Sequence, residues 1–291
     1  MNEIALCFEC QGDPLVGILH RPEQAKRRGV LMVVGGPQYR VGGHRQLTLW
    51  ARRLAADGYP VLRFDYRGMG DSYGEFRGFE WIDEDINAAL TCFVSEIPEL
   101  EEVVLWGGCD AVSAILFYAY RDPRVRGLVL QNPWARTEAG EAKAVLRHYY
   151  LQRFMQPSFW LKVVRLRFNP LDSLRSAWAL VKRARRDQEE AETAPADHRN
   201  LDVALSPDLP LPDRLLAGFS RFRGPVLLVM SGRDLVAREF DDLVRHHPDW
   251  QRQLPLKPVT WRDLAEADHT FSTAAWRNQV VDWALDWLND W

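Results

Sequence analysis

The stretch LWGGCDAVSA, residues 105–114, decides how this 291-residue chain is organised. It begins as a buried strand, passes through two glycines and continues at once as a helical pattern. A strand that turns sharply into a helix crowds its neighbours. Small residues are therefore required two positions before and two positions after the corner, and here they are Gly107 and Ala111. The stretch has the form G-x-S-x-G of a nucleophile elbow, with Cys109 in place of the serine and alanine in place of the last glycine.

Strand and helix patterns alternate on both sides of this corner. A hairpin with the turn QGDP is expected within residues 3–20. The continuous apolar runs of RRGVLMVVGG, EVVLWG and GPVLLVMS are typical of strands buried on both faces. Helices are expected at 44–57, 79–95, 110–120 and 270–289. This alternation predicts βαβ units and an α/β fold with a mainly parallel sheet flanked by helices.

The alternation stops after residue 132 and resumes at residue 223. The intervening segment is basic and helical in pattern, and its part 187–213 is polar and then rich in proline. We therefore predict a core domain of residues 1–132 and 223–291, with a helical insertion at 133–222 that lies over the site as a lid. The insertion's run FWLKVVRLRF pairs apolar residues with three basic ones. This pairing fits an acyl-chain or peripheral membrane contact, but a helix that packs on the core would look much the same and is favoured.

Composition narrows the possible partners. A formal net charge of −3 gives no reason to expect nucleic acid. No apolar run reaches the roughly 20 residues of a membrane span, and the start of the chain lacks the basic region of a signal peptide. The four cysteines are expected to be free thiols in a reducing compartment, so a cytoplasmic protein is predicted. Cys7 and Cys10 form a CxxC without a second pair, and neither a metal nor a cofactor is expected.

Two more residues follow buried strands, at positions where they could act as the acid and the base that an elbow cysteine needs. Asp234 comes shortly after the strand VLLVMS, and His269 lies in the loop between the last strand and the last helix. Open α/β sheets build their sites at the carboxyl ends of strands, and elbow enzymes have the chain order nucleophile, acid, histidine. We therefore predict Cys109 as nucleophile, His269 as base and Asp234 as its orienting acid. Their simpler interpretations are a buried thiol, a loop residue and a helix cap. Rival acids near the histidine are Asp263, Glu266 and Asp268.

Backbone amides near the elbow are the expected oxyanion donors. One is the N–H of Asp110, which follows the nucleophile at the start of a helix. The other is expected from the loop after the strand LMVV, where Gly36 is favoured and Gln38 is the alternative, since Pro37 has no N–H. The carboxylate of Asp110 either caps the helix or opposes ionisation of the neighbouring thiol. Candidate substrate-pocket residues are Tyr39, Trp134 and Trp160.

These motifs together resemble a known superfamily. The loop GGPQYR, the stretch FDYRGMGDSYG, the elbow, Asp234 and His269 are similar to the α/β-hydrolase superfamily over essentially the whole chain. The resemblance implies the α/β-hydrolase fold, with a mostly parallel sheet of the eight-stranded type and hydrolase activity. It also implies that Asp65 and Arg67 tie loops together. More narrowly, GGPQYRVGGHRQ with GGCDAVSA resembles the exosortase A system-associated hydrolases of the type called hydrolase 1. Those proteins accompany bacterial exopolysaccharide and protein-sorting loci.

A cysteine in this position restricts the chemistry. A thiolate attacks a carbonyl to give a thioester acyl-enzyme. Thiolate is also a better leaving group than alkoxide, so attack on an unactivated amide reverses easily. We therefore expect an activated acyl substrate, namely an ester, thioester or lactone, on a small or lipid-linked molecule, and dienelactone hydrolases look similar at the elbow. The alternatives are an acyltransferase with the same triad and a catalytically weak binding protein in a polysaccharide-export system. Ser113 is disfavoured as the nucleophile because it lies one helical turn beyond the corner.

Overall fold

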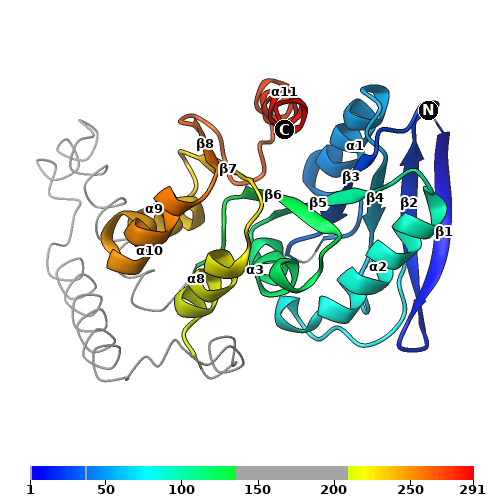
Figure 1. Ribbon diagram of the computed structural model, residues 1–291, viewed down its shortest axis with the longest axis horizontal. Coiled ribbons are helices and arrows are strands. Elements are labelled where there is room, and N and C mark those ends of the chain that lie inside the picture. Colours follow the sequence, from blue (N-terminus) through cyan, green and yellow to red (C-terminus); the bar gives the residue numbers. More distant parts are fainter. Residues whose placement is uncertain (1, 37, 136–208) are drawn as a thin grey trace, which may run out of the picture.

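The fold is built on one sheet of eight strands in the order β1-β2-β4-β3-β5-β6-β7-β8 (Figure 1). The computed structural model describes residues 2–36, 38–135 and 209–291. The strands are β1 (Asn2–Cys10), β2 (Asp13–Arg21), β3 (Arg28–Val33), β4 (Val61–Phe64), β5 (Glu102–Gly108), β6 (Val125–Gln131), β7 (Val226–Ser231) and β8 (Val259–Leu264).

Most of the sheet is parallel. β1 and β2 form the expected antiparallel hairpin, and β2 also pairs antiparallel with β4. All the remaining neighbours pair in parallel. The hairpin turn Gln11–Gly12 has positive φ at both residues, 53° and 88°, which matches the right-handed twist of the strands it joins. The prediction of a mostly parallel, eight-stranded sheet is confirmed.

Helices cover both faces of the sheet. Figure 1 shows α1 and α11 on one side and α2, α3 and α8 on the other, with α9 and α10 beside β7 and β8. This two-sided cover explains why the parallel strands read as continuous apolar runs: every residue of β4 and β7 is buried. The helices are α1 (Gln46–Ala56), α2 (Asp83–Glu96), α3 (Asp110–Tyr118), α8 (Leu211–Arg221), α9 (Leu235–His246), α10 (Pro248–Gln253) and α11 (Ala274–Asn289).

Three helices begin later than the sequence predicts. α1 starts at Gln46 rather than at residue 44, after a 3-10 turn, Gly43–Arg45. The pattern at 79–95 divides into a 3-10 turn, Phe79–Trp81, and α2, which starts at Asp83. The final helix starts at Ala274 rather than at residue 270, because the Thr273 side chain accepts a hydrogen bond from the amide of Trp276 and caps the helix there. The loop that precedes α11 is therefore four residues longer than predicted.

Most of the predicted insertion at 133–222 falls outside the described residues. Its described part includes α8, which packs closely on α3. A Cβ at Gly218 would lie 2.2 Å from the carbonyl oxygen of Leu116, so the two helix backbones are almost in contact. Leu215 and Phe219 on the same helix are buried in the hydrophobic core. The division into core and lid stays a prediction.

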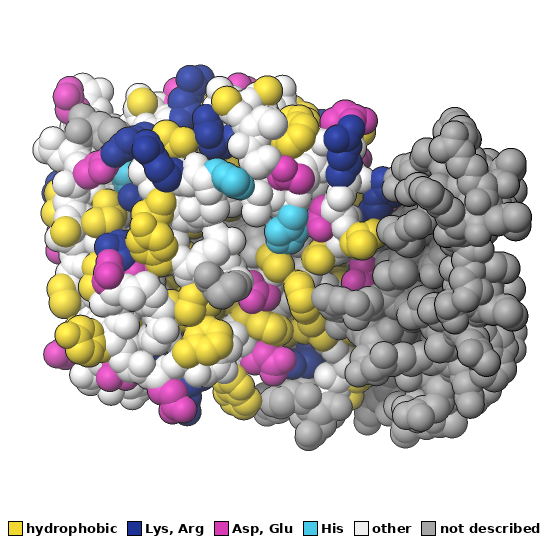
Figure 2. Space-filling view, turned by 180° about the vertical axis from the view of Figure 1, so that it is seen from behind, with side chains coloured by type: hydrophobic (Ala, Val, Ile, Leu, Met, Phe, Trp, Pro, Cys, Tyr) yellow, Lys and Arg dark blue, Asp and Glu magenta, His cyan; other side chains and the backbone are white. Residues whose placement is uncertain are grey.

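The surface carries a mixture of side chains. On the face shown in Figure 2, hydrophobic, basic and acidic side chains are interspersed. Among the residues that the structure describes, no helix is long and apolar enough to cross a membrane.

Candidate active site

Cys109 occupies a strained corner between β5 and α3. Its φ of 59° and ψ of −127° lie outside the regions that side-chain-bearing residues ordinarily adopt. The corner is as crowded as the sequence implied, since a Cβ on Gly107 would lie 2.6 Å from Cδ1 of Ile115 and 3.0 Å from Cβ of Ala111. The amide of Cys109 donates to the carbonyl of Gln131 at 2.9 Å, which fixes the corner to the end of β6. Strain of this kind persists where the surrounding structure holds a side chain in place for function.

His269 and Asp234 lie together beside this corner. Oδ2 of Asp234 is 2.7 Å from Nδ1 of His269, and the ring lines the same small cavity as Cys109. The hydrogen bond with Asp234, and next that with Cys109, raises the pKa of His269 to about 10. Asp234 also caps α9 by accepting the amides of Val236 and Ala237, each at 3.1 Å. Asp234 therefore both caps α9 and contacts the histidine ring. The catalytic roles of the three side chains stay a prediction.

The rival acids have other partners. Asp268 accepts two backbone amides of its own loop, at 3.2 and 3.0 Å, and these bonds shape the turn that carries the histidine. Glu266 pairs with Arg233 at an exposed position. Asp263 accepts the indole N–H of Trp261 at 3.0 Å.

The Gly36 amide, one of the expected oxyanion donors, binds a side chain of the protein itself. The amide of Gly36 donates to Oδ1 of Asp110 at 2.6 Å. The amide of Gln38 donates to the carbonyl of Gly36 at 2.8 Å, so it is used within its own loop, and Pro37 lies outside the described residues. Burial raises the pKa of Asp110, while the amides of Gly36, Ala111 and Asp110 itself act in the opposite direction. The Asp110 carboxylate thus lies among the amides that were predicted to hold an oxyanion.

A small cavity of about 40 Å³ adjoins Cys109 and His269. Val34, Gln38 and Phe271 are among the described residues that line it. Two predicted pocket residues are not in that lining: Tyr39 is 45% exposed, and Trp134 donates its amide to the carbonyl of Cys109 at 3.2 Å. Trp160, the third, lies outside the described residues. The substrate pocket stays a prediction.

The scaffold residues of the FDYRGMGDSYG stretch make the contacts that the resemblance implied. The carboxylate of Asp65 accepts the amide of Arg40 at 2.5 Å and that of Asp71 at 3.1 Å, and it pairs with the Arg40 guanidinium. Arg67 pairs with Asp85 at 2.9 Å. Asp65 thus joins its loop to that of Arg40, 25 residues earlier, while Arg67 joins the same stretch to helix α2.

Asn132 and Ser231 are site residues that the sequence reasoning missed. Nδ2 of Asn132 donates to Oγ of Ser231 at 2.8 Å and to the carbonyl of His269 at 2.9 Å. In return, the amide of Ser231 donates to Oδ1 of Asn132 at 2.8 Å. Ser231 Oγ donates to the carbonyl of Asp268 at 2.8 Å. Both side chains are buried, so this network holds the histidine loop against the ends of β6 and β7. The signal was available in the sequence, since Asn132 directly follows β6 and Ser231 is the last residue of β7.

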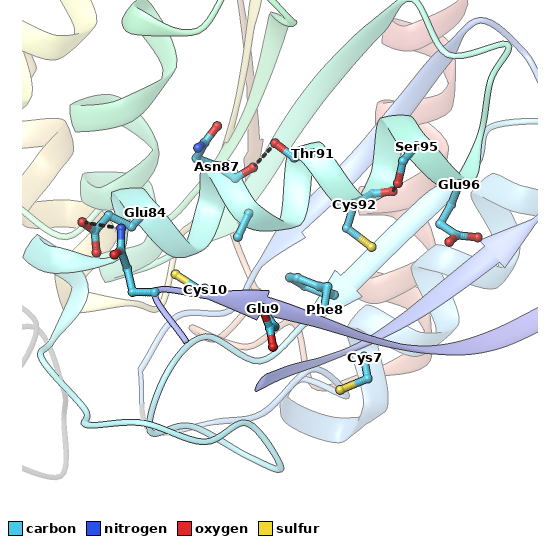
Figure 3. Close-up of a pocket in the computed structure, with 12 residues that line it drawn as sticks. Cys7, Phe8, Glu9, Cys10, Glu84, Asn87, Thr91, Cys92, Ser95 and Glu96 are labelled. Atoms are coloured by element: carbon cyan, nitrogen blue, oxygen red, sulfur yellow. Dashed lines mark hydrogen bonds between the residues drawn. The ribbon is translucent and has the colours of Figure 1, made fainter. Parts of the chain in front are cut away.

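A larger groove of about 570 Å³ lies elsewhere, between β1 and α2 (Figure 3). Cys92 points from α2 toward Phe8 of β1, while Cys7 points to the opposite side of that strand. Burial raises the pKa of Cys10 and that of Cys92 to about 11, which makes these thiols weak nucleophiles near neutral pH. Within the described ranges, no three His, Cys, Asp or Glu side chains are grouped as a metal site requires.

Comparison with known proteins agrees with this architecture. Quorum-quenching protein AidA of Acinetobacter baumannii is 32% identical over 123 residues, but the match spans only 40% of this chain and 39% of AidA. An esterase of Pyrococcus furiosus has a similar fold, with a TM-score of 0.62 and 15% identity, covering 100% of this chain and 91% of the esterase. An α/β serine hydrolase homologue from Coxiella burnetii gives a TM-score of 0.58 at 15% identity, covering 97% of both chains. The family described as Serine aminopeptidase, S33, matches residues 25–258, and the chain therefore belongs to this α/β-hydrolase family.

Proposed function

We propose that the protein is a cysteine-dependent hydrolase of activated acyl groups. Cys109 is the nucleophile, His269 transfers the proton, and Asp234 holds the imidazole in place. The observation that carries the proposal is the strained corner at Cys109, which shares a small cavity with an imidazole whose Nδ1 lies 2.7 Å from a carboxylate oxygen. Nucleophile, base and orienting acid each follow a different strand, and all three meet at the carboxyl edge of the sheet.

The reaction proceeds in two halves. His269, whose pKa is raised to about 10, draws the proton from the Cys109 thiol, so that an imidazolium forms beside a thiolate. The thiolate attacks the acyl carbonyl, and the leaving group takes the imidazolium proton as the tetrahedral intermediate collapses to a thioester. Water then gives a proton to His269 and attacks the thioester, which releases the acid and regenerates the thiolate.

The substrate class follows from the nucleophile. Expulsion of the thiolate competes with expulsion of the substrate's leaving group, so esters, thioesters and lactones suit this site better than unactivated amides. The resemblance to exosortase A system-associated hydrolases supports a role in bacterial exopolysaccharide or exosortase-associated metabolism, on a small or lipid-linked acyl compound. If an alcohol or amine replaces water in the second half, the same acyl-enzyme makes the protein an acyltransferase.

Covalent labelling tests the proposal. The protein is incubated with a short-chain p-nitrophenyl ester, its mass is measured, and the adduct is mapped to a peptide. We expect one acyl group on Cys109, absent from Cys109→Ala and retained in Cys7→Ser, which removes an exposed thiol outside the site. If no adduct forms and iodoacetamide also fails to label Cys109, the site is not a working nucleophile and the chain is a binding protein.

A further inference from the structure

We propose that the Asp110 carboxylate occupies the oxyanion site of the resting protein, so that an acyl substrate must displace it before Cys109 can react. The inference rests on the proposed function and adds to it the residue that selects substrates. Asp110 then takes part in the reaction through its amide, as an oxyanion donor, and hinders it through its side chain.

The hydrogen bonds at the elbow carry the proposal. The Gly36 amide has a single hydrogen, and it donates this hydrogen to Oδ1 of Asp110, with 2.6 Å between the nitrogen and the oxygen. A donor in use by a carboxylate cannot polarise a substrate carbonyl at the same time. One of the predicted donors, the Gly36 amide, is therefore engaged by a side chain of the protein.

Packing explains why the carboxylate lies there. A Cβ on Gly35 would be 2.1 Å from the carbonyl oxygen of Gly108 and 2.8 Å from Oδ1 of Asp110. Glycine at this position lets the loop approach the elbow until the Gly36 amide faces it. The carboxylate thereby accepts the Gly36 amide, which is one of the donors predicted to hold an oxyanion.

When a substrate binds, its carbonyl must replace the Asp110 carboxylate as the acceptor of the Gly36 amide. This exchange favours one class of substrate. Hydrogen bonds to a carboxylate are roughly twice as strong as those to a neutral carbonyl, so a ground-state ester displaces Asp110 at a cost. Binding energy from parts of the substrate remote from the reacting carbonyl offsets this cost. The structure therefore assigns to this site acyl groups borne on a large, well-bound carrier, and it disfavours small free esters.

Two reagents that attack the same thiol test the inference. Iodoacetamide alkylates by displacement at a saturated carbon and forms no oxyanion, whereas p-nitrophenyl acetate acylates through one. In Asp110→Ser we expect the acylation rate constant of Cys109 to rise about tenfold, within the roughly 10²–10³-fold that one oxyanion donor contributes. The alkylation rate constant should change less than about threefold, because it depends on the ionisation and accessibility of the thiol and uses no oxyanion donor.

Two further variants sharpen the comparison. Asp110→Asn keeps the shape and an acceptor for Gly36 but removes the charge, so its acylation gain should be smaller than that of Asp110→Ser. Asp83→Ser removes an exposed carboxylate from the first turn of α2 and should change neither rate constant.

Each contrary outcome is distinct. If both rate constants rise together in Asp110→Ser, the carboxylate acts on the thiolate and not on the oxyanion site. If acylation falls in Asp110→Ser and Asp110→Asn, the side chain holds the loop in its active form. Either result overturns the inference. If neither reagent labels Cys109 in the unaltered protein, the proposed function itself fails.

Discussion

The strain at Cys109 is a property of one residue that the whole site depends on. A side-chain-bearing residue in a sparsely populated φ/ψ region costs about 1–3 kcal/mol, and glycine avoids most of that cost. This strain persists at the elbow because a relaxed backbone conformation would not lift the side chain out of the strand–helix corner. Relief of the strain is measurable when the nucleophile is removed.

We expect Cys109→Gly to be more stable than Cys109→Ala by about 1 kcal/mol, since alanine keeps the strained φ of 59° and glycine does not. Urea unfolding of the two inactive variants measures the difference. The same pair of substitutions at Cys92, inside α2, is the matched control. There alanine should be the more stable by about 1 kcal/mol, because helix interiors disfavour glycine. The same ordering at both positions would contradict a strained elbow.

The charge on His269 makes the stability of the site depend on pH. The hydrogen bond with Asp234, and next that with Cys109, raises the pKa of His269 from 6.5 to about 10. Because the folded pKa lies above the unfolded one, the stabilisation is fully present below pH 6.5 and is lost as pH rises toward 10. The free energy of unfolding of the unaltered protein should therefore exceed that of His269→Gln most at low pH. Urea titrations between about pH 6 and 10 measure this gap, and a gap that widens with pH contradicts the assignment.

At the scale of elements, apolar runs predicted the strands well because burial on both faces leaves a continuous hydrophobic signature. The triad candidates were also predictable, since each of them follows its own strand or begins its own helix. The contacts that tune the site were not. The Gly36–Asp110 bond joins residues 74 apart, and the Asn132–His269 bond joins residues 137 apart. Such contacts depend on how separate βα units meet at the edge of the sheet, which local patterns do not encode.

The Asn132–Ser231 network belongs to this scale because it joins β6, β7 and the histidine loop. Asp in place of Asn132 keeps the acceptor for the Ser231 amide but loses both donated bonds, including the one to the His269 carbonyl. We expect Asn132→Asp to lower kcat for ester hydrolysis about tenfold with little change in KM, because the histidine loop loses its anchor while the oxyanion site is untouched. Ser231→Ala keeps the hydrogen bond from Asn132 to the His269 carbonyl, so its kcat should fall less than that of Asn132→Asp. Equal losses in kcat and stability for both variants would show a purely structural role.

At the scale of the whole molecule, the two ends of the parallel strands have different roles. The candidate site gathers at the carboxyl ends of the parallel strands, while the end of the chain is tied to their amino ends. Arg28, the first residue of β3, donates to the carbonyl of Leu288 at 2.8 Å and stacks on the Trp291 ring at 3.7 Å. Gly127 of β6 allows this approach, since a Cβ there would lie 2.6 Å from the Trp291 ring.

Trp291→Ala should therefore reduce stability without changing the chemistry. Loss of the cation–π contact with Arg28 and of the packing against Gly127 should lower the free energy of unfolding by about 1–3 kcal/mol. The acylation rate constant of Cys109 should stay within about twofold of its original value at a temperature where the variant is folded, because open α/β sheets build their sites at the opposite edge. Urea unfolding and acylation kinetics on the same preparation measure both quantities. A loss of acylation in the fully folded variant would show that the contacts at the amino ends of the strands influence the site at their carboxyl ends. The proposed separation of stability from chemistry would then be wrong.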